Sequence, residues 1–155
     1  MPQMNKGGKF IFGESVIDAD GRIQLPPQAV AEYRIAEDGK VYLFTGSRIT
    51  GGFCVTRRGL LLPSKLGHIL TETPELLNYT APSSKFIRYK GRAYCWTDIS
   101  ENGEIHLTAE MRAFLQLQID MQLLCICSSD IAFTMGAKGS LLEKADQFEG
   151  EIPLY

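Results

Sequence analysis

Two related segments lie 82 positions apart in this chain of 155 residues, and their presence restricts the fold more than composition does. When residues 20–49 are aligned with residues 102–131, seven of the thirty positions are identical. After a two-residue contraction the alignment continues, and Phe53 falls on Phe133. A repeat of this kind predicts that one supersecondary unit forms twice and that neighbouring units bury their apolar faces together.

Each copy has the pattern of a strand, a tight turn, a second strand, a short helix and a hairpin. The turn is Asp20-Gly21 in the first copy and Asn102-Gly103 in the second, and both dipeptides accept positive φ. Apolar and polar residues alternate after each turn, as in a half-buried strand. Pro26-Pro27 suits the first turn of one helix, and Thr108 is the expected N-cap of the other.

These patterns divide the chain into four parts. We expect a first repeat over 9–62, a connector over 63–86, a second repeat over 87–145 and a loose tail over 146–155. Prolines in the connector exclude one long helix but leave room for short helical turns. One repeat alone is too small to enclose a core comfortably, so we expect a mainly β fold with short helices.

Composition is that of a globular protein. The chain is 45% hydrophobic and 22% charged, which argues against disorder and low-complexity structure. No apolar run is long enough for a spanning helix, and the first residues lack the apolar segment of a secretory signal. The four cysteines do not form the pattern of a disulfide framework. We therefore expect a soluble, cytoplasmic protein with no membrane partner.

The net charge of -2 hides an imbalance between the two halves. Residues 1–92 contain 13 Lys/Arg and 8 Asp/Glu, a net of +5, whereas residues 93–155 contain 3 and 10, a net of -7. This split indicates either an anionic partner for the first half or attraction between the two halves, within one chain or across a dimer.

The first turn lies within a longer motif. Residues 17–26 read apolar-Asp-x-x-Gly-Arg-apolar-x-apolar-Pro. This stretch resembles the swapped-hairpin domain of the SpoVT–AbrB superfamily, and two such units in one chain are similar to the arrangement of the MraZ family. The resemblance implies that the AbrB-like repeats interleave their hairpins into a small β-barrel. The barrel would form either within one chain, as a pseudo-dimer, or between chains of a homo-oligomer.

The same resemblance implies a DNA-binding transcriptional regulator that contacts double-stranded DNA through its basic first repeat. Arg22 follows the turn, where it can reach a phosphate or a guanine edge; alternatively it is a solvated residue that pairs with Asp18 or Asp20. Arg57 and Arg58 end a strand, a position that equally suits protection of a strand edge. The expected DNA-binding residues are Arg22, Arg34, Arg57, Arg58, Lys9 and Gln24.

The second copy departs from the motif. Ser100, Glu104 and Thr108 replace its aspartate, arginine and proline, so this copy is interpreted as a structural partner. The alternative function is a protein-interaction or assembly module without DNA binding, in which the acidic second repeat binds a basic partner, as antitoxins of this superfamily engage toxins. The acidic residues concerned are Asp98, Glu101, Glu104 and Glu110.

A denser basic cluster, KFIRYKGR, occupies residues 85–92. Basic residues interleaved with aromatic ones suit contact with a nucleic-acid backbone and its bases. The same pattern is typical of a strand with an apolar inner face and a basic outer face. Sequence alone leaves both interpretations open.

Catalytic and metal-binding motifs are missing from the sequence. It contains no nucleophile elbow, P-loop, dinucleotide fingerprint or His-Glu-x-x-His. Cys125-x-Cys127 lacks the spacing of a zinc knuckle. We therefore expect neither an enzyme nor a bound metal or cofactor.

Overall fold

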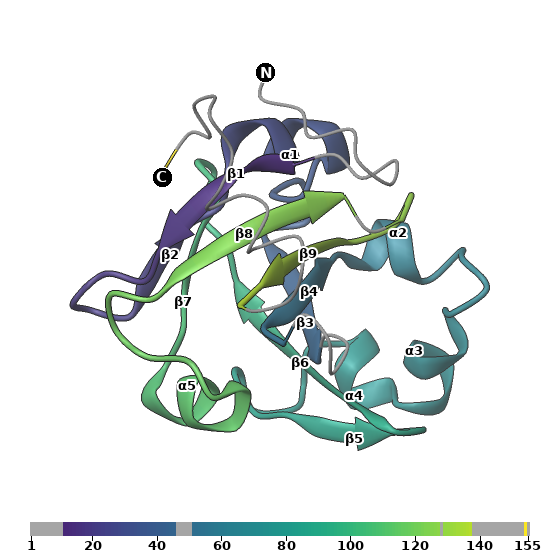
Figure 1. Cartoon of the computed structure of the whole chain (residues 1–155). Helices are drawn as coiled ribbons and strands as arrows, with labels where there is room; N and C mark the ends of the chain where they lie inside the picture. The colour runs from purple at the N-terminus through teal and green to yellow at the C-terminus, as the bar shows by residue number, and fades with distance from the viewer. Residues whose placement is uncertain (1–10, 46–50, 128, 138–153, 155) are drawn as a thin grey trace.

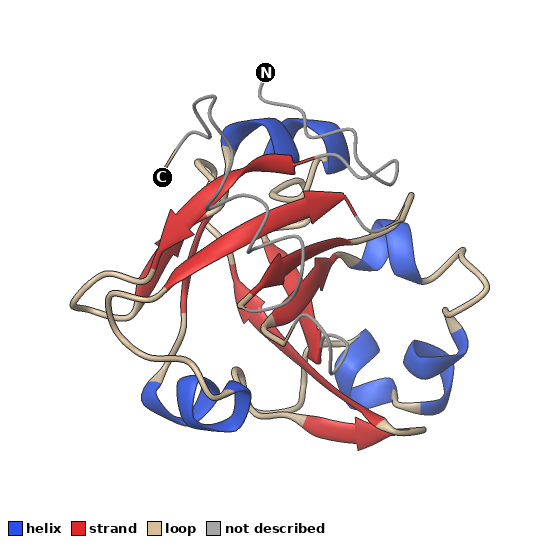
Figure 2. Cartoon of the chain, viewed as in Figure 1, coloured by secondary structure: helices blue, strands red, loops and turns tan. Residues whose placement is uncertain are grey.

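The computed structural model describes residues 11–45, 51–127, 129–137 and 154. These residues form a mainly β structure with a few short helices (Figures 1 and 2), which confirms the expectation of a mainly β fold. The strands are β1 (Ile11–Val16), β2 (Arg22–Gln24), β3 (Lys40–Thr45), β4 (Phe53–Thr56), β5 (Ile87–Tyr89), β6 (Arg92–Asp98), β7 (Glu104–His106), β8 (Gln122–Cys127) and β9 (Phe133–Gly136). The helices are α1 (Pro27–Tyr33), α2 (Arg58–Leu61), α3 (His68–Glu72), α4 (Pro74–Leu77) and α5 (Ala109–Leu115).

Local signals in the sequence account for how the two longest helices begin. Pro27 is the first residue of α1, where its fixed φ suits the first turn and its missing N–H costs no hydrogen bond. Thr108 is the N-cap of α5, and its hydroxyl accepts a hydrogen bond from the backbone N–H of Met111 at 3.2 Å. Both helices end in a residue with positive φ, Arg34 in α1 and Gln116 in α5.

The strands form two antiparallel sheets. A seven-stranded sheet has the order β1-β8-β9-β4-β3-β6-β5, and β2 pairs with β7 in a separate two-stranded ribbon. The larger sheet has two edges, β1 and β5, so the hydrogen bonds of the described residues do not close the small β-barrel that the family resemblance implied. Three of the six neighbouring pairs in the larger sheet, β1-β8, β9-β4 and β3-β6, join distant parts of the chain.

Two of these long-range pairings have the same register. Ser15 of β1 pairs with Leu123 of β8, and Thr97 of β6 pairs with Val41 of β3. The first residues of the two pairs differ by 82 positions (97 − 15), and so do the second ones (123 − 41). The strand that enters the turn in one segment therefore pairs with the strand that follows the helix in the other.

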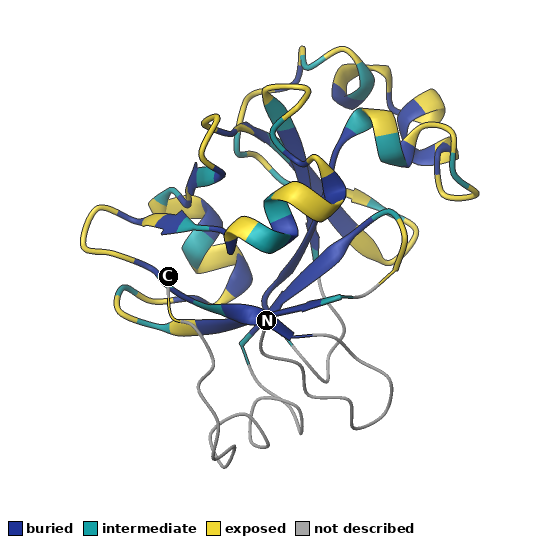
Figure 3. Ribbon diagram, turned by 90° about the horizontal axis from the view of Figure 1, so that it is seen from above, coloured by how far each residue is buried: buried dark blue, intermediate teal, exposed yellow. Residues whose placement is uncertain are grey.

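Two apolar clusters lie against the strands. The larger combines buried residues of the ribbon, α1, α5 and the inner strands, and its members include Ile23, Leu25, Ile105, Leu107 and Phe133. The smaller lies where the connector meets the sheet, and it includes Tyr42, Phe44, Leu61, Leu70, Leu76 and Tyr94. Figure 3 shows the buried residues concentrated on the strands and the exposed ones on helices and turns.

The connector is folded against the sheet. Its two short helices, α3 and α4, contribute Ile69, Leu70 and Leu76 to the smaller cluster. The indole N–H of Trp96 in β6 donates to the backbone oxygen of Ala81 at 2.8 Å, which ties the end of the connector to the sheet. The expected tail, 146–155, lies outside the described residues except for Leu154, which forms an isolated parallel bridge with Glu14.

Candidate nucleic-acid interface

The turn before Arg22 is built by the motif residues themselves. The carboxylate of Asp18 accepts hydrogen bonds from the backbone N–H of Asp20 at 2.9 Å and of Arg22 at 3.0 Å. Gly21 has a φ of 82°, and a Cβ at this position would lie 2.6 Å from the backbone oxygen of Leu107. Asp18 and Gly21 therefore shape the turn, and the guanidinium of Arg22 takes no part in the turn's hydrogen bonds.

The second turn keeps this geometry although its residues differ. The hydroxyl of Ser100 accepts a hydrogen bond from the backbone N–H of Glu104 at 2.9 Å, the same type of bond that Asp18 makes with Arg22. Gly103 has a φ of 85°, close to that of Gly21. A serine hydroxyl can thus replace the aspartate, which is why the degenerate motif still forms the turn.

The two turns lead into the β2–β7 ribbon. Its central pair, Ile23 and Ile105, is buried toward the larger cluster, with each residue 1% exposed. Because side chains alternate along a strand, the residues on either side of this pair face outward. In register, Arg22 lies opposite His106, and Gln24 lies opposite Glu104.

The charges on the outer face of the ribbon compensate each other. Nη1 of Arg22 lies 3.3 Å from Oε1 of Glu104, and the two side chains remain 54% and 39% exposed. An exposed pair of this kind contributes between about 0 and 1 kcal/mol, so a phosphate can compete for the guanidinium. The imidazole Nε2 of His106 lies 3.0 Å from the backbone oxygen of Asp20, which holds the ring beside the first turn.

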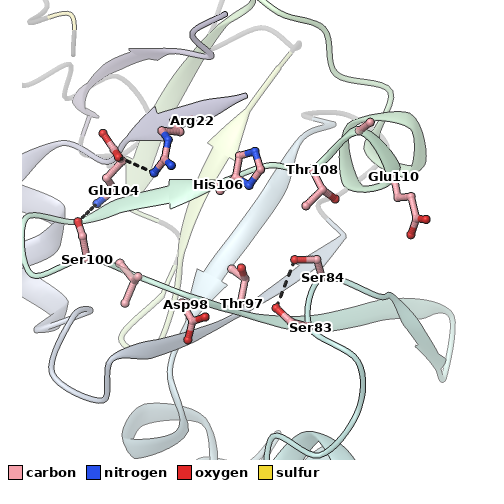
Figure 4. Close-up of a pocket in the computed structure, with 12 residues that line it drawn as sticks. Arg22, Ser83, Ser84, Thr97, Asp98, Ser100, Glu104, His106, Thr108 and Glu110 are labelled. Carbon is pink, nitrogen blue, oxygen red and sulfur yellow. Dashed lines mark hydrogen bonds and ion pairs between the residues drawn. The ribbon is translucent and has the colours of Figure 1, made fainter. Parts of the chain in front are cut away.

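An open cleft of about 810 Å³ lies beside the ribbon. Figure 4 shows Arg22, Glu104 and His106 along one side and residues of β6 and the end of the connector along the other. Its charged lining consists of Arg22 and three carboxylates, Asp98, Glu104 and Glu110. Asp98 also pairs with Lys40, at 2.9 Å. The cleft is therefore polar and more acidic than basic.

Arg57 does not lie on the outer surface. It is buried, its Nη2 lies 3.0 Å from Glu37 and its Nη1 lies 3.2 Å from Asp38. Its Nε–H donates to the backbone oxygen of Tyr33 at 3.3 Å. A DNA contact by Arg57 would require these contacts to break, so we leave it out of the candidate interface.

The other expected residues that the structure describes do not gather at one place. Gln24 lies on the ribbon and donates to the backbone oxygen of Asn102 at 2.6 Å. Arg34 is exposed at the end of α1, with a φ of 49°. Arg58 belongs to α2, where it donates to the backbone oxygen of Leu77 at 3.1 Å and lies 5.0 Å from the ring centre of Tyr79. Lys9 lies outside the described residues.

Sequence reasoning did not place His106 and Glu104 beside Arg22. The alternation of polar and apolar residues indicated which side chains face outward. The cross-strand register that makes them neighbours depends on pairing between residues more than 80 positions apart. One signal was available: Glu104 is the residue that aligns with Arg22 in the repeat.

All four cysteines are free thiols, and Cys54, Cys95 and Cys125 are buried. Burial raises the pKa of the Cys95 thiol to about 12 and raises the pKa of Cys54 and Cys125 above the ordinary value of 9.0. The Sγ of Cys127 lies 3.4 Å from the hydroxyl of Tyr33. Within the described part of the chain, no three His, Cys, Asp or Glu side chains gather in a way that could hold a metal ion.

No protein-family model, curated protein or solved structure matches this chain. The likeness to the SpoVT–AbrB superfamily therefore stays a prediction from the sequence. Among the helices of the described residues, none has the length and apolar character needed to cross a membrane.

Proposed function

We propose that this protein is a DNA-binding transcriptional regulator that contacts double-stranded DNA with the outer face of the β2–β7 ribbon. The observation that carries the proposal is the exposed Arg22, held by the turn beside Gln24 and directly opposite His106. A two-stranded antiparallel ribbon fits the major groove. Arginine there can bind phosphate or guanine, and the amide of Gln24 and the imidazole of His106 add hydrogen-bonding groups.

We also propose that the two repeats interleave as a pseudo-dimer within one chain. The equal registers of β1 with β8 and of β6 with β3 support this arrangement. So do two pairs in which a residue meets its own counterpart, Ile23 with Ile105 in the ribbon and Cys54 with Thr134 between β4 and β9. Such pairs are expected on a two-fold axis. One chain presents only one Arg22, so a homo-oligomer would place several along one duplex.

Arg22→Ala is expected to weaken binding to the DNA upstream of the protein's own gene by about tenfold, because a good arginine–base contact contributes about 1–3 kcal/mol. Glu104→Gln is expected to bind at least as tightly as the unchanged protein, because it removes the carboxylate that competes with phosphate for Arg22. The measurement is a fluorescence-anisotropy titration at low and physiological salt, with a scrambled duplex for comparison.

A suitable control for this pair is Lys40→Gln. It removes one cation that also forms an ion pair with a carboxylate, but on β3 rather than on the ribbon. Its affinity should stay within about twofold of that of the unchanged protein, whose binding should fall steeply with salt. Equal affinities of Arg22→Ala and the unchanged protein would remove the ribbon as the DNA contact.

A second candidate function is an assembly module that binds a basic protein partner. The observation in its favour is the Arg22–Glu104 pair, which leaves the ribbon without net positive charge, together with the carboxylates Asp98 and Glu110 in the adjacent cleft. The same titration separates the two functions. Weak binding that is equal for the upstream and scrambled duplexes, and unchanged in Arg22→Ala, would favour the assembly module.

A further inference from the structure

The β5–β6 hairpin carries four exposed cations that no carboxylate neutralises in the described part of the chain. They are Lys85, Arg88, Lys90 and Arg92. We name residues 85–94 the basic hairpin. The carboxylate of Glu72 accepts a hydrogen bond from the hydroxyl of Tyr89 and forms no ion pair with these cations. This differs from Arg22 and Arg57, which are both paired with carboxylates.

The positive charges of the basic hairpin lie on both of its faces and at its turn. Tyr89 pairs with Arg92, and the two residues between them, Lys90 with φ 46° and Gly91 with φ 84°, form a tight turn of the type preferred in hairpins. Arg88 pairs with Ala93, one step from the Tyr89–Arg92 pair. Because successive side chains point to opposite faces, Arg88 and Arg92 lie on opposite faces of the basic hairpin, and Lys90 lies in its turn.

Aromatic rings hold these cations in place. The guanidinium of Arg88 lies 5.5 Å from the ring centre of Phe114, and that ring is stacked on Phe86 at 4.4 Å. The guanidinium of Arg92 lies 5.6 Å from the ring centre of Phe44, and the ammonium of Lys90 lies 5.3 Å from that of Tyr89. Such contacts orient a cation without neutralising it. Because the rings are already engaged, they are poorly placed to stack on the bases of a single strand.

We propose that the basic hairpin is a second DNA-contact surface, which binds the phosphates of a duplex. One or two charges on β5 would suffice to protect the edge of the sheet from pairing with another chain. Four uncompensated cations, three of them on the two faces and in the turn, exceed that need, and the phosphates of double-stranded DNA carry the complementary charge. The basic hairpin and the ribbon would bind the same class of ligand, but they are separate surfaces. In Figure 1 the hairpin turn lies at the lower right and the ribbon at the left.

The test is the triple variant Arg88→Gln, Lys90→Asn and Arg92→Gln in the full chain, titrated against a short labelled duplex of scrambled sequence. Lys90→Asn places Asn-Gly in the turn, the dipeptide that this turn type prefers, so the hairpin is preserved. Between about 50 and 200 mM salt, the slope of log affinity against log salt should fall by about 2–3, since each phosphate contact contributes about 0.9. Affinity at the lower salt should fall by about tenfold or more.

The matched control is Arg88→Lys with Arg92→Lys, which keeps the charge and should keep both affinity and slope. Circular dichroism and thermal unfolding verify that both variants fold. An unchanged slope and affinity in the triple variant would overturn the proposal. A single-stranded oligonucleotide is titrated in parallel, and a loss of binding seen only with that oligonucleotide and not with the duplex would also overturn it. Arg22→Ala, titrated in parallel, tests the ribbon separately. The results can therefore exclude one surface as a DNA contact without excluding the other.

Discussion

Arg57→Ala is expected to lower the free energy of unfolding by about 3 kcal/mol, because it removes a buried side chain and breaks its ion pairs with the more exposed carboxylates of Glu37 and Asp38. The substitution also removes the donor to the backbone oxygen of Tyr33. For a chain of this length, such a loss corresponds to a fall in Tm of about 6–12 °C. Thermal and urea unfolding measured together would provide both quantities.

The control for Arg57 is Arg34→Gln. Arg34 is exposed and ends α1 with a φ of 49°, and glutamine occupies the corresponding position of α5 at a φ of 59°. This variant removes the same charge at a site where glutamine fits the backbone, so we expect a change within about 0.5 kcal/mol. If Arg57→Ala and Arg34→Gln were equally stable, the buried ion-pair cluster would not contribute to stability.

The protein is expected to lose stability steeply above pH 9. Burial raises the pKa of Cys95 to about 12 and that of Cys125 well above the ordinary 9.0, so both thiols keep their protons in the folded chain. The unfolded chain releases these protons near pH 9, so it binds fewer protons than the folded chain above that pH. Stability is therefore full below pH 9 and falls by about 1.4 kcal/mol per pH unit for each such thiol.

For Cys95 alone the loss by pH 11 is about 3 kcal/mol, and Cys125 adds to it. Buried Tyr33 and Tyr42, whose pKa values burial also raises, add to it at still higher pH. Urea unfolding at a series of pH values measures the slope. The double variant Cys95→Ala, Cys125→Ala removes both titrating groups, so its stability should be lower at neutral pH but fall less with rising pH. A slope equal to that of the unchanged chain would contradict the assignment.

Local chemistry explains why the secondary structure could be predicted. The positive φ of Gly21 and Gly103, the N-cap Thr108 and the initiating Pro27 each depend on a residue and its close neighbours in sequence. Alternation of apolar and polar residues likewise indicates which side of a strand is buried. These signals predicted the mainly β class and the positions of both turns.

The residues of the candidate interface were predicted only in part, because their surroundings depend on segments that are distant in the sequence. Arg57 and Arg58 are adjacent in the sequence, yet Arg57 is buried among carboxylates and Arg58 packs on an aromatic ring of the connector. Whether an arginine at the end of a strand meets solvent or a carboxylate depends on which distant segment packs against it. No local pattern encodes that choice.

The sequence by itself determined the turns, the alternating strands, the helix starts and the similarity between the two segments, because these features depend on neighbouring residues. Only the tertiary structure decided that β2 pairs with β7, that Arg22 meets Glu104, and that the basic hairpin keeps its charges uncompensated. Each of these depends on the register between segments distant along the chain. That register is selected by burial of the combined apolar faces.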